Sequence, residues 1–145
     1  MSEVLLVTGG SRGIGAATAI CAAKKGWDIA INYARDANAA NKVAAEVRAL
    51  GRRSMEIKGD MTSEDDILNM FEQVEKDLGQ ITGLVNSAGT TGKTARVQDM
   101  TASAIREIME LNVVGLMLCC REAVKRMSIK NGGPQVRSPK KYLLT

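Results

Sequence analysis

Short apolar runs alternate along this chain with longer stretches in which apolar residues recur at helical spacing. A continuous apolar run predicts a buried strand at residues 4–7, and short stretches that contain apolar residues predict further strands at 27–31, 54–57 and 81–85. The helical spacing predicts helices at residues 14–25, 38–50, 62–78 and 101–127. Strands that alternate with helices in this way imply a parallel sheet with helices on both faces and right-handed crossovers. The predicted fold class is therefore α/β with a doubly wound parallel sheet.

The long final helix and the residues after it complete the predicted organisation. Its candidate buried positions are apolar residues at helical spacing: Ile105, Ile108, Met109, Leu111 and Leu116. The sequence Asn-Gly-Gly-Pro at 131–134 breaks the helix. We therefore expect one domain over residues 1–131 and a basic tail of different pattern over 132–145. The Tyr-Leu-Leu at 142–144 either forms a short strand or packs on the surface, and the pattern leaves both open.

The composition is that of one globular domain with a restricted set of reactive groups. The chain has 145 residues, of which 45% are hydrophobic and 25% charged, and a chain of this length buries roughly two thirds of its surface on folding. The formal net charge is +4, and the basic residues are scattered outside the tail, so we expect no nucleic-acid partner. The chain has no His, which excludes serine-protease-type triads and His-ligated zinc.

The cysteines and the apolar segments indicate a cytoplasmic protein. Cys21, Cys119 and Cys120 lie in apolar runs without C-x-x-C spacing, so neither a disulfide framework nor a metal site is expected. The first residues do not have the basic end and long apolar run of an export signal. The longest strongly apolar stretch, 113–120, is far below the roughly 20 residues that span a bilayer. We therefore expect no membrane partner.

A glycine-rich loop joins the first predicted strand to the first helix. Residues 8–15 read T-G-G-S-R-G-I-G, and this is the place where a dinucleotide pyrophosphate binds in doubly wound folds. Gly9 allows a tight turn, Gly13 allows the backbone to approach the phosphates, and Gly15 allows close packing of helix on sheet. The alternative is an ordinary strand-to-helix turn, for which one glycine is enough.

The loop has the spacing G-x-x-x-G-x-G and is followed by Asp60, by Asn-Ser-Ala-Gly at 86–89 and by Asn112. With these motifs the chain resembles the N-terminal half of the short-chain dehydrogenase/reductase family, in its compact, classical branch. The resemblance covers about residues 4–131 and implies a Rossmann fold, incomplete at its C-terminal side. It also implies an oxidoreductase that moves a hydride between a nicotinamide dinucleotide and a small alcohol or carbonyl substrate.

The resemblance assigns roles to individual residues. Asp60 is implied to contact the adenine, with a helix-capping acid as the alternative. Ser87 departs from the Asn that the family usually has there, which shortens a hydrogen-bonding side chain. Asn112 is implied to support a water linked to the catalytic lysine, with an ordinary polar residue in a buried helix as the alternative. The residues implied to bind the cofactor are Gly9, Ser11, Arg12, Gly13, Ile14, Gly15, Arg35, Asp60, Asn86, Ala88 and Gly89.

The choice of cofactor depends on the end of the second strand. An NAD site usually has an acid there for the ribose hydroxyls, whereas a 2′-phosphate needs cations, and Asn32 and Tyr33 are neutral. Asp36, about 20 residues beyond the loop, is the alternative acid for the ribose hydroxyls, but it lies past the strand end, where it is expected to cap the second helix. Arg12 and Arg35 resemble the arginine pair of NADP(H)-preferring members. We therefore expect NADP(H) to be preferred, with NAD(H) as the alternative.

The family's catalytic set is missing from these residues. The resemblance implies a Ser and a Tyr-x-x-x-Lys further along, but neither Tyr33 nor Tyr142 precedes a Lys at that spacing. The chain is therefore expected to be inactive alone, as a truncated or frameshifted product, a fragment or a short paralogue. The alternative function is a non-enzymatic nucleotide-binding or assembly module. An open outer edge on the fourth strand and apolar residues on the long helix predict a homo-oligomer.

Overall fold

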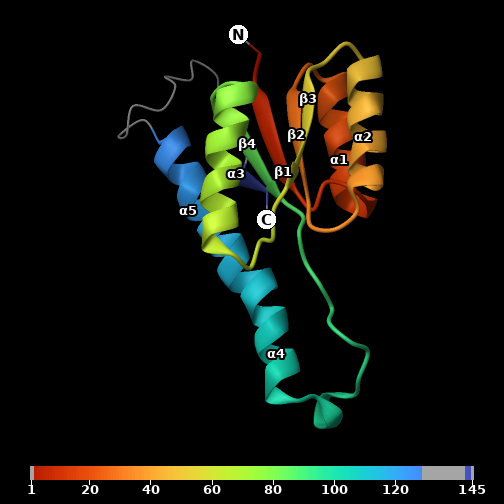
Figure 1. Cartoon of the computed structure of the whole chain (residues 1–145), viewed down its shortest axis with the longest axis vertical. Helices are drawn as coiled ribbons and strands as arrows, with labels where there is room; N and C mark the ends of the chain where they lie inside the picture. Colours follow the sequence, from red (N-terminus) through yellow and green to blue (C-terminus); the bar gives the residue numbers. More distant parts are fainter. Residues whose placement is uncertain (1, 129–142, 145) are drawn as a thin grey trace.

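The computed structural model describes residues 2–128 and 143–144. Its strands form one parallel sheet in the order β3-β2-β1-β4-β5. The predicted α/β class and doubly wound parallel sheet are confirmed (Figure 1). The elements are β1 (Val4–Thr8), α1 (Gly13–Lys24), β2 (Asp28–Tyr33), α2 (Ala37–Ala49), β3 (Ser54–Lys58), α3 (Glu64–Asp77), β4 (Ile81–Asn86), the 3-10 turn η1 (Val97–Asp99), α4 (Ala102–Met109), the π-helical turn η2 (Glu110–Gly115), α5 (Leu116–Met127) and β5 (Leu143–Leu144).

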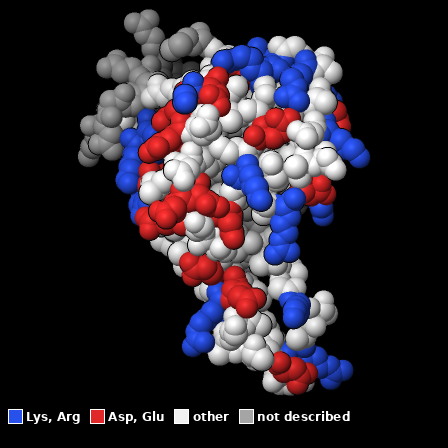
Figure 2. Space-filling model, in the orientation of Figure 1, with Lys and Arg blue, Asp and Glu red and all other residues white. Residues whose placement is uncertain are grey.

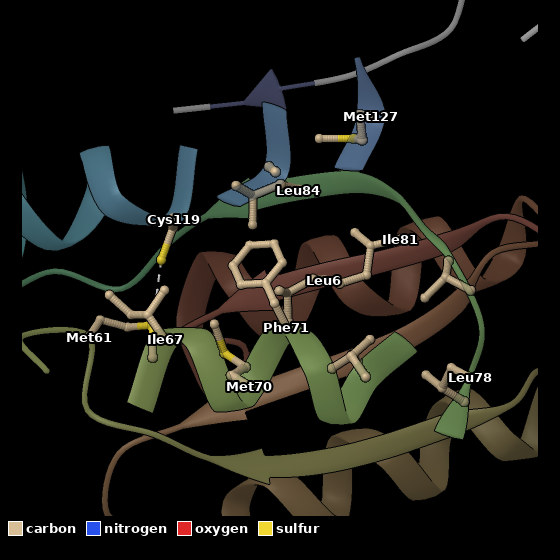
Figure 3. Packing of buried hydrophobic residues seen from close by; sticks show 14 residues of the cluster. Leu6, Met61, Ile67, Met70, Phe71, Leu78, Ile81, Leu84, Cys119 and Met127 are labelled. Carbon is tan, nitrogen blue, oxygen red and sulfur yellow. Dashed lines mark hydrogen bonds between the residues drawn. The ribbon is translucent and has the colours of Figure 1, made fainter. Parts of the chain in front are cut away.

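Two apolar clusters, one on each face of the sheet, hold these layers together. On one face α1 and α2 pack on β1 and β2, and on the other α3 and α5 pack on β1 and β4 (Figure 1). Phe71 of α3 is fully buried and points at the sheet between Leu6 of β1 and Leu84 of β4 (Figure 3). Burial of each such side chain contributes about 1.5–3 kcal/mol, so this face of the sheet fixes α3.

The long helix differs from the prediction in two ways. It is interrupted by the π turn η2, and only α5 lies against the sheet, whereas α4 extends beyond the strands (Figure 1). The expectation that Ile105 and Met109 are buried is therefore wrong, since they are 46% and 49% exposed. Ile108, Leu111 and Leu116 are half-buried. At the end of the π turn, a Cβ on Gly115 would lie 2.0 Å from the carbonyl oxygen of Met61, so a glycine is required where the helix crosses the β3–α3 loop.

The outer edge of β4 is partly covered by the end of the chain. Leu143 and Leu144 form β5, which pairs in parallel with Leu84 and Val85. The expectation of a fully open edge is therefore wrong over these two residues, because main-chain groups of β5 pair there. Tyr142, the predicted domain boundary at 131 and most of the predicted tail lie outside the described residues.

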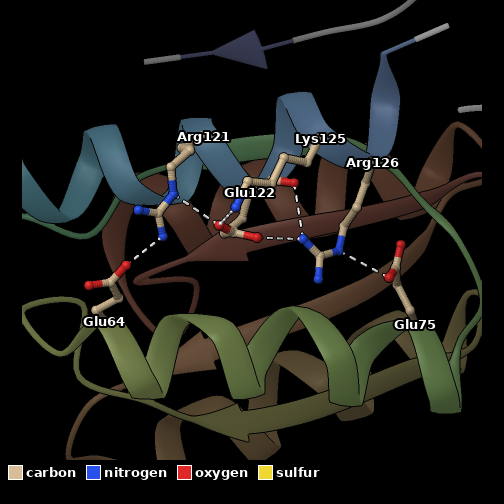
Figure 4. Close-up of polar contacts among 6 residues, drawn as sticks. All are labelled: Glu64, Glu75, Arg121, Glu122, Lys125 and Arg126. Atoms are coloured by element: carbon tan, nitrogen blue, oxygen red, sulfur yellow. Dashed lines mark hydrogen bonds and ion pairs between the residues drawn. The ribbon is translucent and has the colours of Figure 1, made fainter. Parts of the chain in front are cut away.

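Helices α3 and α5 are joined by a network of charged side chains centred on Glu122 (Figure 4). The Glu122 side chain is 3% exposed, and its carboxylate accepts hydrogen bonds from Arg121 Nε at 3.0 Å, Lys125 Nζ at 2.8 Å and Arg126 Nη1 at 2.8 Å. Arg126 also donates to Glu75 of α3 at 3.0 Å. Burial raises the pKa of Glu122, but the hydrogen bonds from the three cations outweigh burial and lower that pKa to about 2.

Glu122→Gln is expected to lower the free energy of unfolding by about 2–3 kcal/mol at pH 7, because a buried carboxylate with three cationic partners is lost. The folded-state pKa lies below the ordinary value of 4.5. This contribution is therefore complete above that value and is lost as the pH falls towards 2. The difference in urea unfolding between the two proteins should shrink over the same pH range.

Glu72→Gln is the control, since Glu72 is exposed on α3, and it should change stability by less than about 0.5 kcal/mol. A difference between Glu122→Gln and the unmodified chain that is the same at pH 7 and pH 3 contradicts the network as the source of the lowered pKa.

Candidate functional site

The glycine loop lies directly against the backbone that follows β4. Gly9 has a φ of +59°, and a Cβ there would lie 2.8 Å from both the Cα and the N of Ala88. A Cβ on Gly15 would lie 2.5 Å from the carbonyl oxygen of Gly9 and 3.0 Å from Ser87 Oγ. The loop, the start of α1 and residues 87–88 are thus packed too closely for side chains at these two glycines.

Two buried polar side chains hold this arrangement, and the sequence analysis assigned neither to the site. The Thr8 hydroxyl accepts hydrogen bonds from the backbone N–H groups of Ser87 at 3.1 Å and Ala88 at 3.2 Å. Asn32 Oδ1 accepts from Gly9 N at 3.1 Å, while Asn32 Nδ2 donates to Gly59 O at 3.1 Å. The signal was available, since Thr8 ends an otherwise apolar strand and Asn32 directly follows the apolar run at 29–31. Buried polar groups require partners.

The N-terminus of α1 differs from those of the next three helices. Asp36, Ser63 and Thr101 cap α2, α3 and α4 through side-chain hydrogen bonds, but Arg12 at the N-cap of α1 makes none. Gly13 has a φ of +52°, and a Cβ there meets nothing within 4 Å. Ile14 is 81% exposed. The first N–H groups of α1 have no partner within the helix, so this helix end suits an anion.

Two arginines lie beside this helix end. Arg12 forms an ion pair with Asp36, and Asp36 Oδ1 accepts from Ala39 N at 2.9 Å as the N-cap of α2. The expected capping role of Asp36 is thereby confirmed. The Ala39 N–H and then Arg12 lower the pKa of Asp36, so its carboxyl is ionised at neutral pH. Arg35 is exposed, and its guanidinium has no ion pair or hydrogen bond among the described residues.

The predicted adenine contact, Asp60, lies in the loop between β3 and α3. Its carboxylate accepts from Thr62 N at 2.9 Å and from Thr62 Oγ1 at 2.7 Å. The N-cap of α3 is Ser63, so the alternative in which Asp60 caps that helix is wrong. Asn32 links this loop to the glycine loop through Gly59. The structure thus holds the two loops together at the carboxyl ends of β1, β2 and β3.

On the other side, the residues after β4 meet the long helix. Asn86 Nδ2 donates to Cys120 Sγ at 3.3 Å. Asn112, within the π turn, accepts from Thr90 N at 2.8 Å and donates to Thr90 O at 2.7 Å. A Cβ on Gly89 would lie 3.4 Å from Asn112 Oδ1. Asn112 therefore fixes the loop after β4, and both the oxygen and the nitrogen of its side-chain amide are used in doing so.

The predicted residues thus converge on one edge of the sheet. Gly9 lies against both Ala88 and Gly15, Arg12 belongs to the same loop, and Asp60 lies in the loop that Asn32 links to it. Asn112 holds the segment after Gly89. Ser11 is half-buried, and no side-chain contact places it further. Such an edge offers backbone donors, cations and open space, which suit a phosphorylated ligand.

Two other kinds of site receive no support from the described residues. Within residues 2–128, no group of three or more Cys, Asp or Glu side chains is arranged to hold a metal ion. None of the helices described there has the length and apolarity that crossing a bilayer requires. Figure 2 shows acidic side chains gathered over α3, with Lys and Arg toward β3 and α2, so charges of both signs share this face.

Comparison with known proteins decides the family. The family described as short chain dehydrogenase matches residues 3–136. The chain belongs to the short-chain dehydrogenase family. Its members bind nicotinamide dinucleotides and are oxidoreductases, and the chain shows the parallel Rossmann-type sheet of the family.

The chain spans about half the length of the relatives that it matches. The chain is 40% identical over 130 residues to the uncharacterized oxidoreductase YgfF of Escherichia coli, covering 90% of this chain and 53% of that protein. It is 33% identical over 132 residues to a 3-oxoacyl-[acyl-carrier-protein] reductase of Synechocystis, with 91% and 53% covered. A short chain dehydrogenase from Burkholderia cenocepacia, solved in complex with NADP, superposes with a TM-score of 0.80 at 36% identity, over 85% of this chain and 50% of that one.

Gly9→Ala is expected to destabilise the short-chain dehydrogenase fold more than Gly13→Ala. Both positions have a positive φ, so both substitutions add about 1–2 kcal/mol of backbone strain. Only the Cβ at position 9 also collides with Ala88, which adds about 1–3 kcal/mol. Urea unfolding of the two variants measures the difference, and equal losses would contradict the close approach of the loop to Ala88.

Proposed function

We propose that this chain binds NADP(H) as the nucleotide-binding portion of a short-chain oxidoreductase that acts on an alcohol or carbonyl substrate. One observation carries the proposal: α1 begins without a side-chain cap, beside the open space at Gly13. A pyrophosphate supplies the negative charge that this helix end lacks. When bound, the nicotinamide supplies the hydride chemistry, while residues of the chain hold and orient the dinucleotide.

Each side of the site has a role in this proposal. The backbone of residues 11–15 binds the pyrophosphate, since its N–H groups lie at the start of α1. Asp60 contacts the adenine at the β3 side. Asn86, Ala88 and Gly89 line the cofactor at the β4 side. Asn112 acts indirectly, because it fixes the backbone at Thr90.

NADP(H) is the proposed preference over NAD(H). Asn32 near the end of β2 is neutral and is used in holding the loops, and the nearby acid, Asp36, caps α2 and pairs with Arg12. Arg12 and Arg35 lie at the adjoining loops, and a 2′-phosphate makes strong charge-assisted contacts with guanidinium groups. The Burkholderia relative, at 36% identity, was solved with NADP.

NADPH is expected to bind the 145-residue chain more tightly than NADH. Losing a charge-assisted hydrogen bond costs about 1.5–3 kcal/mol, so Arg35→Ala should narrow the preference by roughly tenfold or more. Calorimetric titration with each cofactor measures the two dissociation constants.

Two further variants complete that experiment. Gly13→Val should abolish binding of both cofactors, because the added side chain occupies the space proposed for the pyrophosphate. It should keep the helical content, because that space lies outside the core. Lys25→Ala, at the opposite end of α1, should leave both affinities within twofold. Equal affinities for the two cofactors in the unmodified chain contradict the NADP(H) preference.

The 145-residue chain is expected to turn over carbonyl substrates at no measurable rate by itself. It contains no Tyr-x-x-x-Lys, and general acid catalysis alone contributes about 10²–10⁴-fold. NADPH consumption over a panel of carbonyl compounds measures turnover. The lack of a Tyr-x-x-x-Lys motif in these residues also favours the second candidate function, a non-enzymatic nucleotide-binding or assembly module. Robust turnover by pure chain contradicts both the expected inactivity and this second candidate.

We also propose that the chain self-associates through the long helix. Exposed apolar residues recur on it at four-residue intervals, at Ile105, Met109, Val113 and Met117, and Met117 is 64% exposed. Ile105 and Met109, four residues apart within α4, lie on one face of that helix, and Val113 and Met117 continue the exposed apolar positions across the π turn. We call these four positions the apolar stripe. Exposed stripes of this kind mark contact surfaces.

Met117→Lys is expected to weaken self-association at least tenfold, because a charge would be buried in an apolar contact. Sedimentation or light scattering over a concentration series measures the effect. Val97→Lys is the matched control, since Val97 is 85% exposed but lies on η1, outside the stripe. If the unmodified chain remains a monomer at all concentrations, the proposed self-association is contradicted.

A reducing, cytoplasmic location completes the proposal. The three cysteines are free thiols, with Cys21 exposed, Cys119 buried and Cys120 half-buried. Burial raises the pKa of Cys119 to about 12, so this thiol is unreactive at neutral pH. Unpaired thiols of this kind are typical of proteins kept in a reducing compartment.

A further inference from the structure

Asp36 makes two contacts with different consequences. One carboxylate oxygen accepts from Ala39 N at 2.9 Å and caps α2. The other pairs with the guanidinium of Arg12, which comes from the glycine loop. The neighbouring Arg35 is exposed and forms no ion pair or hydrogen bond through its side chain within the described part of the chain. The two arginines at this edge of the sheet therefore differ, since one is already paired and the other is not.

We propose that Asp36 is a specificity-determining residue, which weakens the preference for a 2′-phosphate by holding Arg12 in an ion pair. The inference rests on the proposed binding of NADP(H) and deepens it. A 2′-phosphate that reaches Arg12 must share or replace the Asp36 carboxylate, and it carries a charge of the same sign as that carboxylate. A dinucleotide without the 2′-phosphate has no charge there and is indifferent to this competition.

The size of the effect follows from exposure. The Arg12 and Asp36 side chains are 71% and 36% exposed, and ion pairs in contact with water are weak. Removal of the carboxylate should therefore strengthen binding of the 2′-phosphate about three- to tenfold, and not by several hundredfold. Arg35 can bind the 2′-phosphate without first giving up an ion pair, whereas Arg12 is paired with Asp36. Arg35→Ala should therefore weaken NADPH binding more than Arg12→Ala does.

The two roles of Asp36 are separable by substitution. Asn caps helices about as well as Asp, so Asp36→Asn keeps the hydrogen bond to Ala39 and removes only the charge. Asp36→Ser is a second variant of the same design, since Ser is also a good N-cap residue. Glu46→Gln is the matched control, because Glu46 is exposed on α2 and its loss changes the net charge by the same amount.

The experiment measures dissociation constants of NADPH, NADH, adenosine 2′,5′-bisphosphate and 5′-AMP for the 145-residue chain and these variants. Asp36→Asn and Asp36→Ser should each bind NADPH and the bisphosphate three- to tenfold more tightly. Binding of NADH and AMP should change by less than twofold, and Glu46→Gln should change nothing by more than twofold. In an Arg12→Ala background, the gain from Asp36→Asn should fall below twofold.

Each contrary result has a distinct meaning. Unchanged or weaker NADPH binding by Asp36→Asn and Asp36→Ser overturns the inference and leaves the proposed function intact. A full gain that persists without Arg12 also overturns it, because the ion pair is then not the cause. Binding of neither dinucleotide to the unmodified chain overturns the proposed function and this inference together.

Discussion

The site depends on one close approach of backbone to backbone. Gly9 lies against Ala88 so tightly that no Cβ fits between them, and the Thr8 hydroxyl and the Asn32 amide fix the segments on either side. Because β1 and β4 are neighbours in the sheet, this contact sets where the glycine loop turns and hence where α1 begins. A side chain at Gly9, or at Gly15 against the carbonyl oxygen of Gly9, would move the first turn of α1 away from the ends of the strands, and with it the backbone donors at the start of that helix.

The long helix supplies the second constraint, because three features along it bind three separate parts of the molecule. Asn112 holds the loop after β4 through Thr90, Gly115 allows contact with the backbone of Met61 after β3, and Glu122 with its cations joins α5 to α3. The first two lie within the π turn, with Asn112 near its middle and Gly115 at its end. An uninterrupted α-helix would rotate Asn112 relative to α5 and could not satisfy these contacts together. The interruption of the helix thus positions both sides of the site, in agreement with the frequent occurrence of π turns at functional sites.

The strands, helices and glycine loop were predictable because each depends on a pattern of residues that are close together in the sequence. Apolar runs and helical spacing locate the elements within one or two residues, and Asp36 was identifiable as a cap from its position alone. What the sequence could not supply depends on partners far along the chain. Ile105 and Met109 have the spacing of buried residues, but α4 has no layer of the described structure to pack against. Neither the pairing of β5 with β4 nor the central position of Asn32 has a local pattern, since each is defined by contacts between distant segments.

The one helix among α1 to α4 that lacks a side-chain cap is the one at the site. A missing cap costs about 1 kcal/mol of helix stability, and Gly13 in a left-handed conformation adds an entropic cost. The core offsets both, because Ala19 and Ala23 of α1 are buried against β1 and β2. Violations of local helix rules concentrate at functional sites when the rest of the fold is consistent. The first turn of α1 can therefore keep its N–H groups without partners among the described residues, which is the condition under which a bound anion gains the most from them.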